Sequence, residues 1–378
     1  MEFVLKTCVW DRDGDVLVVV CDPGEQIELI DPDGKVETLL DILRTGPYTP
    51  AAVRTALAER GIEAGAEEID DVLTALDGLR LIENAHERSL EDPAVEERHF
   101  SNLAFFGLFS SMRSGRARMQ NRLRNAHVLQ LGTGGLGSNV VQSMAGLGIG
   151  RLTLLDDDMV EPRNFARQFL YRADQIGEPK VFRAADWVRA YDPSIDVRAV
   201  HKRVIGPQDV ADLLKRVDVV VAGVDTPPEV DLWVNEACVR AGVPLVRGGV
   251  VGAGPVYYSV DPGRSACLAC RDAQRRRELT ADGLDGVVAR LVARLPNVNT
   301  GIGPILALVG SLVAFEALCY LTRFQEPYAA GATVTLDRGD GFRPTRRPWP
   351  RDPVCELCDE AFRRTGATTV LAPADPVG

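Results

Sequence analysis

Hydrophobic and polar positions follow two different patterns along this chain, and the pattern changes near residue 98. In the first 85 residues, β-rich runs come first and helical spacing follows. The β-rich runs, which turn signals at Asp13-Gly14 and Pro23-Gly24 separate, are residues 3–10, 16–21 and 26–30. The clearest helical face has apolar residues at i, i+3, i+4 and i+7, namely Ile69, Val72, Leu73 and Leu76. Strands followed by helices predict a small winged-helix-like α+β domain over residues 1–85.

From residue 98 onward, strand-like apolar runs alternate with helical patterns. The preceding residues 86–97 are polar and acidic, and they predict a linker. The expected strands are residues 128–131, 152–155, 197–204 and 217–222, with another that begins at residue 244. The expected helices are residues 138–147, 180–191 and 229–241, and a long apolar helix at 302–321 that we expect to be buried. This alternation predicts an α/β domain over residues 98–366 with a Rossmann-like, mostly parallel sheet, followed by a flexible tail at residues 367–378.

Composition and charge exclude some classes of partner. The chain of 378 residues has no run of eighteen apolar residues and no basic, then apolar N-terminus. We therefore expect no membrane-spanning helix, no signal peptide and a cytoplasmic location. The net charge of −11 would repel a phosphate backbone, so nucleic acid is not expected as a partner. Arginine runs within residues 113–124 and 275–277 are solvated faces or, alternatively, local contacts for an anionic ligand.

A glycine-rich loop is the first candidate site. Four glycines follow the strand at 128–131 and open the next helix: Gly132, Gly134, Gly135 and Gly137. Glycines in this setting let the backbone approach phosphates closely, and the helix N-terminus offers unpaired N–H groups. Asp156 follows the next strand, where a carboxylate can bind ribose hydroxyls. The motif alone leaves a dinucleotide, ATP and a purely structural turn open.

A polar segment beyond Asp156 favours a nucleoside triphosphate over a dinucleotide. It contains an amide and an arginine cluster and then a lysine, namely Asn164, Arg167, Gln168 and Lys180. A triphosphate carries much more negative charge than a dinucleotide, and Arg167 and Lys180 can counter that charge. Asp225, which follows the apolar strand at 217–222, is a candidate Mg²⁺ ligand. Each of these residues alone is more often a surface group, so the prediction depends on their order.

These elements together resemble the adenylation site of the ThiF/MoeB family, whose members are relatives of the ubiquitin-activating enzymes. The resemblance covers roughly residues 96–360. It implies an adenylyltransferase that binds ATP and Mg²⁺, lets a peptide carboxylate attack the α-phosphate, and releases pyrophosphate. By this resemblance the glycine loop, Asp156, Asn164 and Gln168 bind the nucleotide, and Arg167, Lys180 and Asp225 serve catalysis. It also implies a homodimer, because the family builds its sites across paired subunits.

Two CxxC pairs far apart in the sequence form the second candidate site. Their members are Cys267, Cys270, Cys355 and Cys358. Such pairs predict a structural zinc bound by four thiolates, and the same pairs are typical of the family. A redox role is the alternative, but neither pair has a thioredoxin-like setting. No cysteine lies between Cys270 and Cys319, where family members that pass sulfur or form a thioester carry a reactive one, and this disfavours sulfur-carrier activation.

The N-terminal region indicates which branch of the ThiF/MoeB family the chain resembles. A small winged-helix-like domain before the adenylation domain resembles the precursor-recognition domain of enzymes that modify ribosomal peptides, and residues 233–241 and 353–358 resemble the microcin C type. Such domains bind a leader peptide as an added strand, here in a groove between residues 26–30 and 69–76. We therefore expect a ribosomal precursor peptide as partner, and a downstream modifying enzyme as a possible second one. A plain dimerisation or packing domain is the alternative.

One position departs from the family pattern. Family members begin the catalytic domain with an arginine motif whose second arginine reaches the ATP of the partner subunit, but here Ser101 stands in its place. The leaving pyrophosphate then loses a countercharge, unless Arg113, Arg116 or Arg118 substitutes. The second hypothesis is therefore a non-catalytic leader-peptide-binding partner of a separate cyclodehydratase. Sulfur-carrier activation and a dehydrogenase remain as further alternatives.

Overall fold

The computed structural model describes residues 1–22, 24–252, 254–281, 283, 285–292, 294 and 300–366. The chain divides into two compact units, Met1–Arg122 and Leu123–Gly378. This division lies beyond residue 98, where the sequence pattern changes, so α5 (Phe100–Phe109) belongs to the first unit. The expected flexible tail at 367–378 and the turn residue Pro23 lie outside the described residues.

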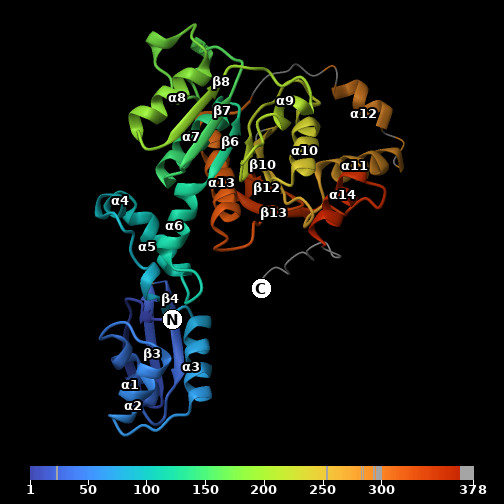
Figure 1. Ribbon diagram of the computed structural model, residues 1–378. Coiled ribbons are helices and arrows are strands. Elements are labelled where there is room, and N and C mark those ends of the chain that lie inside the picture. The colour runs from blue at the N-terminus through green and yellow to red at the C-terminus, as the bar shows by residue number, and fades with distance from the viewer. Residues whose placement is uncertain are drawn as a thin grey trace. The chain divides into compact units, whose positions relative to one another are not determined.

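The first unit combines two small antiparallel sheets with a set of helices (Figure 1). One sheet pairs β1 (Phe3–Leu5) with β5 (Ile82–Asn84), and the other has the order β2 (Val9–Asp13), β3 (Val16–Asp22), β4 (Glu25–Ile30). The remaining helices of this unit are α1 (Lys35–Leu43), α2 (Pro50–Ala58), α3 (Ala66–Gly78), η1 (Ala85–Glu87), α4 (Pro93–Arg98) and α6 (Arg116–Asn125), which runs across the division. The unit is therefore a compact α+β structure built from short elements.

Two expectations for this unit are wrong. The single β-rich run at 3–10 is two strands in different sheets, because β1 pairs with β5 while β2 pairs with β3. The expected linker at 86–97 contains most of α4, whose cap Asp92 accepts a hydrogen bond from the Ala94 N–H at 2.9 Å. A capped helix is ordered structure, and acidic composition alone did not reveal it.

The apolar face of α3 belongs to the core of the first unit. Ile69, Leu73 and Leu76 are each 2% exposed and pack with β1, β3 and α1 residues. These three side chains face the core of the unit, and the groove expected between residues 26–30 and 69–76 stays a prediction. β4, in contrast, is an edge strand of its sheet, and its glutamates Glu25 and Glu28 are exposed. Among the described residues no further strand pairs with β4, so this edge of the sheet is open.

The second unit is built on an eight-stranded sheet with a parallel centre (Figure 1). Five parallel strands are β10 (Leu245–Val251), β9 (Val219–Ala222), β6 (His127–Leu131), β7 (Arg151–Leu155) and β8 (Asp196–Val200). Three antiparallel strands extend the β10 edge: β11 (Gly254–Val260), β12 (Ala332–Asp337) and β13 (Arg343–Pro348). β6 and β9 are buried along their whole length, as central parallel strands covered on both faces must be. The expected α/β fold with a mostly parallel sheet is confirmed.

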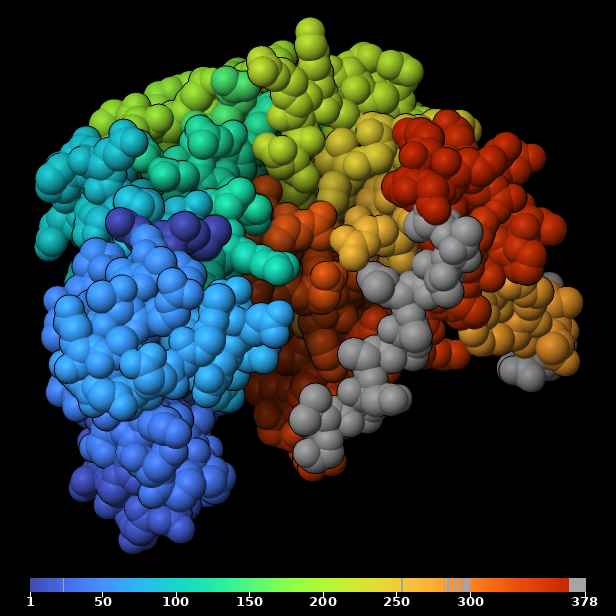
Figure 2. All heavy atoms as spheres, turned by 60° about the horizontal axis from the view of Figure 1, so that its bottom comes forward, coloured from blue at the N-terminus to red at the C-terminus, as the bar shows by residue number. Residues whose placement is uncertain are grey.

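Helices cover both faces of this sheet. They are α7 (Gly135–Leu147), α8 (Lys180–Tyr191), α9 (Pro207–Ala211), α10 (Val230–Ala241), α11 (Leu268–Ala281), α12 (Asp285–Val292), α13 (Gly303–Thr322) and α14 (Glu356–Thr365), with short turns η2 (Pro162–Asn164), η3 (Ala173–Gln175) and η4 (Arg338–Asp340). The expected elements are confirmed, with one strand ending earlier, at Val200, and another extending to Val251. Arg277 of α11 donates to Asp352, between β13 and α14, at 2.7 Å. The colours of these two parts of the chain adjoin in the space-filling view (Figure 2).

α13 is long and apolar enough, by length and composition only, to cross a membrane. It packs against α7, β10 and β11, and 61% of its most apolar window is buried inside the protein. The expectation that this helix is buried is confirmed. Its one charged residue, Glu316, is buried and accepts hydrogen bonds from Ser259 Oγ and the Ala329 N–H. The helix is a core element of this sheet.

Candidate functional site

The glycine loop connects β6 to α7, as the sequence predicts, and its glycines meet close backbone neighbours. Gly132 has a φ of 87°, and a Cβ there would lie 2.9 Å from the carbonyl oxygen of Gly223. A Cβ on Gly137 would lie only 2.0 Å from the carbonyl oxygen of Gly132. Gly134 has only an amide nitrogen of Gln168 near its own virtual Cβ, at 3.7 Å. Backbone atoms thus pack closely around Gly132 and Gly137, whereas space is left beside Gly134.

The N-terminus of α7 faces the loop without a side-chain cap. Gly134 is its N-cap residue and supplies no side chain to the first N–H groups. Those N–H groups and the positive end of the helix dipole favour an anion, most of all a phosphate. In the sheet, β6 has β7 as its neighbour on one side and β9 on the other, so the strand order changes direction at β6. α/β folds bind ligands at such switch points.

Asp156 fastens the glycine loop to the end of β7. Its Oδ2 accepts hydrogen bonds from the Thr133 N–H at 2.6 Å and the Thr133 hydroxyl at 2.8 Å. Its Oδ1 accepts one from the Asp158 N–H at 2.8 Å. Burial raises the pKa of this carboxyl, and these hydrogen bonds only partly offset that effect. The sequence analysis missed this bond between Asp156 and the loop.

The buried residues Asn164 and Gln168 and the half-buried Arg167 follow on the next segment, and their hydrogen bonds differ. Asn164 is 3% exposed, and its Oδ1 accepts a hydrogen bond from the Glu161 N–H at 2.9 Å, which shapes the turn η2. Arg167 and Gln168 differ, because the Nε of the first and the Oε1 of the second are buried and have no hydrogen-bond partner among the described residues. Unpaired buried polar atoms cost free energy, so these two atoms can gain hydrogen bonds from a ligand or from water that enters the cavity.

Lys180 begins α8 and places a cation in the same cavity. The residue is 4% exposed, and its Nζ donates to Asp158 Oδ2 at 2.7 Å. The Asp158 carboxylate is exposed, so the pair can open when a stronger anion enters. Lys180, Arg167 and the N-terminus of α7 thus bring positive charge to one end of the cavity.

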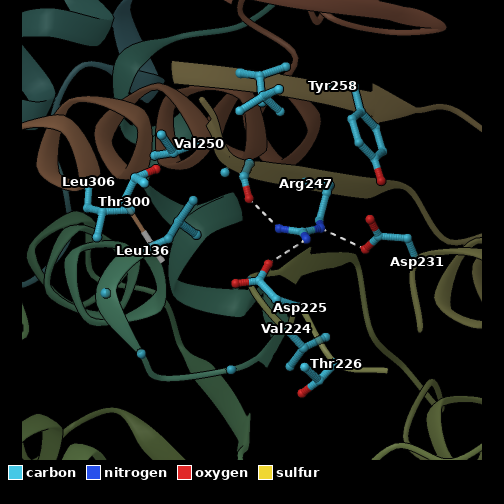
Figure 3. Close-up of a pocket in the computed structure, with 18 of the residues that line it drawn as sticks. Leu136, Val224, Asp225, Thr226, Asp231, Arg247, Val250, Tyr258, Thr300 and Leu306 are labelled. Atoms are coloured by element: carbon cyan, nitrogen blue, oxygen red, sulfur yellow. Dashed lines mark hydrogen bonds and ion pairs between the residues drawn. The ribbon is translucent and has the colours of Figure 1, made fainter. Parts of the chain in front are cut away.

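Asp225 lies beyond β9 and is held by an arginine that the sequence analysis missed. Arg247, on β10, donates from Nη2 to Asp225 Oδ1 at 2.9 Å and from Nε to Asp231 Oδ1 at 2.7 Å. Figure 3 shows Arg247 between these two carboxylates, with the Tyr258 hydroxyl turned toward them. A lone arginine inside the apolar run before Gly248 was the only signal in the sequence.

The site residues that the sequence predicted, with the exception of Gly137, line one cavity of about 1560 Å³ in the second unit. The glycine loop, Asp156, Asn164, Arg167, Gln168, Lys180 and Asp225 occupy one part of the wall, which we call the nucleotide half. The other part, the far half, comes from β11 to β13 and α11: Tyr258, Arg271, Arg275, Glu278, Thr333, Thr335, Arg347 and Trp349. The structure thus brings the predicted residues together and adds a second half that the motifs did not reveal.

The four paired cysteines form a compact cluster that joins α11 to α14. The Sγ atoms of Cys267 and Cys270 are 4.0 Å apart, those of Cys267 and Cys355 are 3.7 Å apart, and those of Cys270 and Cys358 are 3.4 Å apart. A tetrahedral ion with bonds of about 2.3 Å would place its sulfur ligands roughly 3.8 Å apart. Four sulfurs at this spacing fit a zinc ion, and no disulfide links them.

Ser101 and the arginines that could compensate for it lie in the first unit. Ser101 is exposed on α5. Arg116 is bound to the buried Glu83, with Nη2 2.5 Å from Oε1 and Nε 3.1 Å from Oε2. Arg118 bonds the carbonyl oxygen of Arg113 at 3.0 Å and lies 3.5 Å from Glu87. Arg116 is therefore committed to the core of its own unit and is a poor substitute for the missing arginine.

Comparison with known proteins agrees with this geometry. The model of the ThiF family matches residues 105–357. The molybdopterin-synthase adenylyltransferase of Salmonella typhimurium is 31% identical over 243 residues, which are 64% of this chain and 90% of that protein. The adenylyltransferase and sulfurtransferase MOCS3 of Sus scrofa is 35% identical over 223 residues, 54% of this chain and less than half, 46%, of that protein.

A solved structure resembles nearly the whole chain. It is E. coli MccB with ATP, which has a TM-score of 0.73 at 20% sequence identity and covers 95% of this chain and 100% of its own. At a sequence identity this low, the structural match shows the fold alone. The match of the family model over residues 105–357, together with the assembled glycine loop, Arg167, Lys180 and Asp225, leads to one conclusion: the chain belongs to the ThiF family of adenylyltransferases.

Proposed function

We propose that this protein adenylates the C-terminal carboxylate of a ribosomally made peptide, with ATP as the second substrate, in the cytoplasm. The observation that carries the proposal is the nucleotide half of the cavity. There the uncapped α7 N-terminus, the buried Lys180 and the unpaired polar atoms of Arg167 and Gln168 surround one space. Such a space fits a triphosphate in charge and in hydrogen-bonding capacity.

Each residue has a distinct task in this reaction. The N–H groups of the glycine loop and of the α7 N-terminus bind the phosphates, and Asp156 holds the loop in place through its hydrogen bonds with Thr133. Lys180 and Arg167 neutralise charge on the pyrophosphate as it leaves. Asp225 would hold Mg²⁺, since its side chain lines the cavity and is 66% exposed, and the ion would supply further charge neutralisation. The residues thus contribute positioning and electrostatic stabilisation.

Two structural elements support the chemistry from outside the nucleotide half. The sulfur spacing of Cys267, Cys270, Cys355 and Cys358 supports a structural zinc, which would hold α11 against α14. In the first unit, the open edge of β4 supports a winged-helix-like precursor-recognition domain, to which a leader peptide would add as a strand. Solved E. coli MccB structures contain the MccA peptide, which favours a peptide substrate here. We include a homodimer in the proposal.

Two other functions compete with this proposal. A sulfur carrier protein adenylyltransferase of Thermus thermophilus is 33% identical over 261 residues, but no cysteine lies between Cys270 and Cys319 here to pass sulfur. Ser101 favours the other competitor, a leader-peptide-binding partner of a separate cyclodehydratase. The presence of Arg167, Gln168 and Lys180 together in the lining of one cavity weighs against that competitor, because these are the groups that a triphosphate needs.

ATP–pyrophosphate exchange tests the proposal. We expect exchange that depends on the precursor peptide encoded beside the gene and falls at least about 100-fold in Asp225→Ala. The matched control is Asp174→Ala, since Asp174 is 65% exposed, close to the 66% of Asp225, and is likewise paired with an arginine. Peptide binding by the wild type without any exchange would refute the enzyme and favour the leader-delivery function.

A further inference from the structure

The cavity is larger than one small ligand requires. Pockets for a single small molecule usually measure about 300–1,000 Å³, whereas this cavity is about 1560 Å³. The segments that follow β6, β7 and β9 supply much of the nucleotide half, while residues of β11, β12 and β13 supply much of the far half. β10 lies between these two groups of strands and carries Arg247. Two ligands can therefore occupy the cavity at once, and Arg247 lies where they would meet.

Arg247 lies at the junction, by which we mean the part of the cavity wall between the nucleotide half and the far half. Its side chain is 12% exposed, and it donates to Asp225, to Asp231 and to the carbonyl oxygen of Gly248. A guanidinium has five N–H donors. Among the described residues, only three of those donors have a partner, and the side chain lines the cavity. Two donors remain for a ligand, and an arginine presents them in the planar geometry that suits a carboxylate.

A second buried group lies at the same place. The Tyr258 hydroxyl is buried without a hydrogen-bond partner among the described residues, although the residue lines the cavity. In Figure 3 it is turned toward the pair of Arg247 and Asp231. A small rotation of Asp231 would let this hydroxyl donate to it and fix the orientation of the arginine. A ligand at this place could therefore gain hydrogen bonds both from the Tyr258 hydroxyl and from the remaining donors of Arg247.

The charges at the junction depend on what Asp225 binds. Arg247 contributes +1, and Asp225 and Asp231 contribute −1 each, so the sum is −1 and a carboxylate is repelled. A divalent cation at Asp225 would offset this excess of negative charge, but a triphosphate bound with it adds more negative charge than the cation removes. The charged donors of Arg247 are therefore what would hold a carboxylate at this place.

We propose that Arg247 binds and orients the substrate carboxylate beside the α-phosphate, with Tyr258 and Asp231 positioning its guanidinium. This inference rests on the proposed function. In the step, one carboxylate oxygen forms a bond to the α-phosphorus, and the bond from that phosphorus to the bridging oxygen breaks. Pyrophosphate leaves with the electron pair, and no proton moves because the carboxylate is already ionised. Arg247 binds the carboxylate oxygen that does not attack, which becomes the carbonyl oxygen of the adenylate.

The test uses two stable probes and needs no knowledge of the peptide. The first probe is 5′-O-(N-acetylglycyl)sulfamoyladenosine, which mimics an acyl adenylate, and the second is 5′-O-sulfamoyladenosine, which lacks the acyl group. Calorimetry on the full-length protein gives the ratio of their affinities. We expect Arg247→Gln to lower this ratio roughly 10- to 100-fold, because a hydrogen bond to a charged donor is lost, with little change for the second probe. Arg247→Lys should give an intermediate loss, and Tyr258→Phe a loss of about 3-fold.

The control variant and the other outcomes keep the two proposals apart. Arg183→Gln removes an arginine that is paired with Glu178 and Asp186 on α8, away from the cavity lining, and should leave the ratio unchanged. Binding of both probes with the same ratio in the wild type and in both Arg247 variants would overturn the role of Arg247 and leave the proposed function intact. Failure of the wild type to bind either probe would overturn the proposed function, and this inference with it.

Discussion

The two halves of the cavity differ in how their residues are distributed along the chain. In the nucleotide half, most of the residues lie between Gly132 and Lys180, on consecutive elements from β6 to α8. In the far half, the wall combines Tyr258 of β11, Arg271 of α11 and Trp349 beyond β13. The first half is a local motif, while the second exists only after distant strands have paired. The nucleotide half is therefore encoded mainly by near neighbours in the sequence, whereas the far half depends on long-range strand pairing.

A metal ion would affect the two halves unequally, and its removal should have the largest effect. Cys270 precedes Arg271 on α11, so the cysteine cluster supports the far half directly. We expect Cys358→Ser to abolish zinc binding and to lower the free energy of unfolding by about 4 kcal/mol or more. Inductively coupled plasma mass spectrometry and denaturant unfolding measure these effects. Cys238→Ser, also buried but outside the cluster, should cost only about 1–2 kcal/mol and keep the metal. Equal losses in the two variants would contradict a structural metal.

A methyl group at Gly137 should damage the nucleotide half selectively. Its Cβ would lie 2.0 Å from the carbonyl oxygen of Gly132, a backbone atom that cannot move without opening the loop. We expect Gly137→Ala to cost about 3 kcal/mol of stability and to abolish nucleotide binding. Gly146→Ala on the same helix is the control, since its Cβ would meet only the Tyr191 hydroxyl at 3.8 Å, and it should be neutral or stabilising. Normal binding of an ATP analogue by Gly137→Ala, measured by calorimetry, would show that the loop is not the phosphate site.

Lys180→Gln removes a cation from the nucleotide half and leaves its packing largely unchanged. Its partner Asp158 is 67% exposed, so the loss of the ion pair should hardly change stability. The lost charge-assisted bond to phosphate should weaken binding of a non-hydrolysable ATP analogue roughly 10- to 100-fold. Lys202→Gln, which removes a lysine paired with Asp209 outside the cavity lining, is the control and should bind normally. Equal affinities of the two variants for the ATP analogue would mean that the phosphates do not bind at Lys180.

The sequence predicted what depends on near neighbours and missed what depends on sheet order. The strand, glycine loop and helix around Gly132 follow from local spacing, and the structure places them as expected. Arg247 could not be identified, because its partners Asp225 and Asp231 meet it only when β10 pairs with β9. The α4 helix was missed for a different reason, since its composition resembles that of a linker and its cap is a single aspartate. Apolar spacing in α3 was recognised, but spacing alone does not say whether a face meets the core or a ligand.

The far half should show the smallest effect, and one confined to the second substrate. Arg271 lies over the rings of Tyr258 and Trp349, 5.9 Å and 5.8 Å from their centroids, and its side chain is 30% exposed. Arg271→Gln should raise the KM for the precursor peptide roughly 5-fold, about 1 kcal/mol, because a cation on an aromatic wall is lost. The affinity for the ATP analogue should stay unchanged. Arg276→Gln, an exposed arginine of the same helix, should change neither quantity. Pyrophosphate exchange at varied peptide concentration gives the KM. A parallel loss of nucleotide affinity would mean that the two halves act as one site, whereas a change in KM alone would mean that peptide selection can evolve in the far half without disturbing the nucleotide.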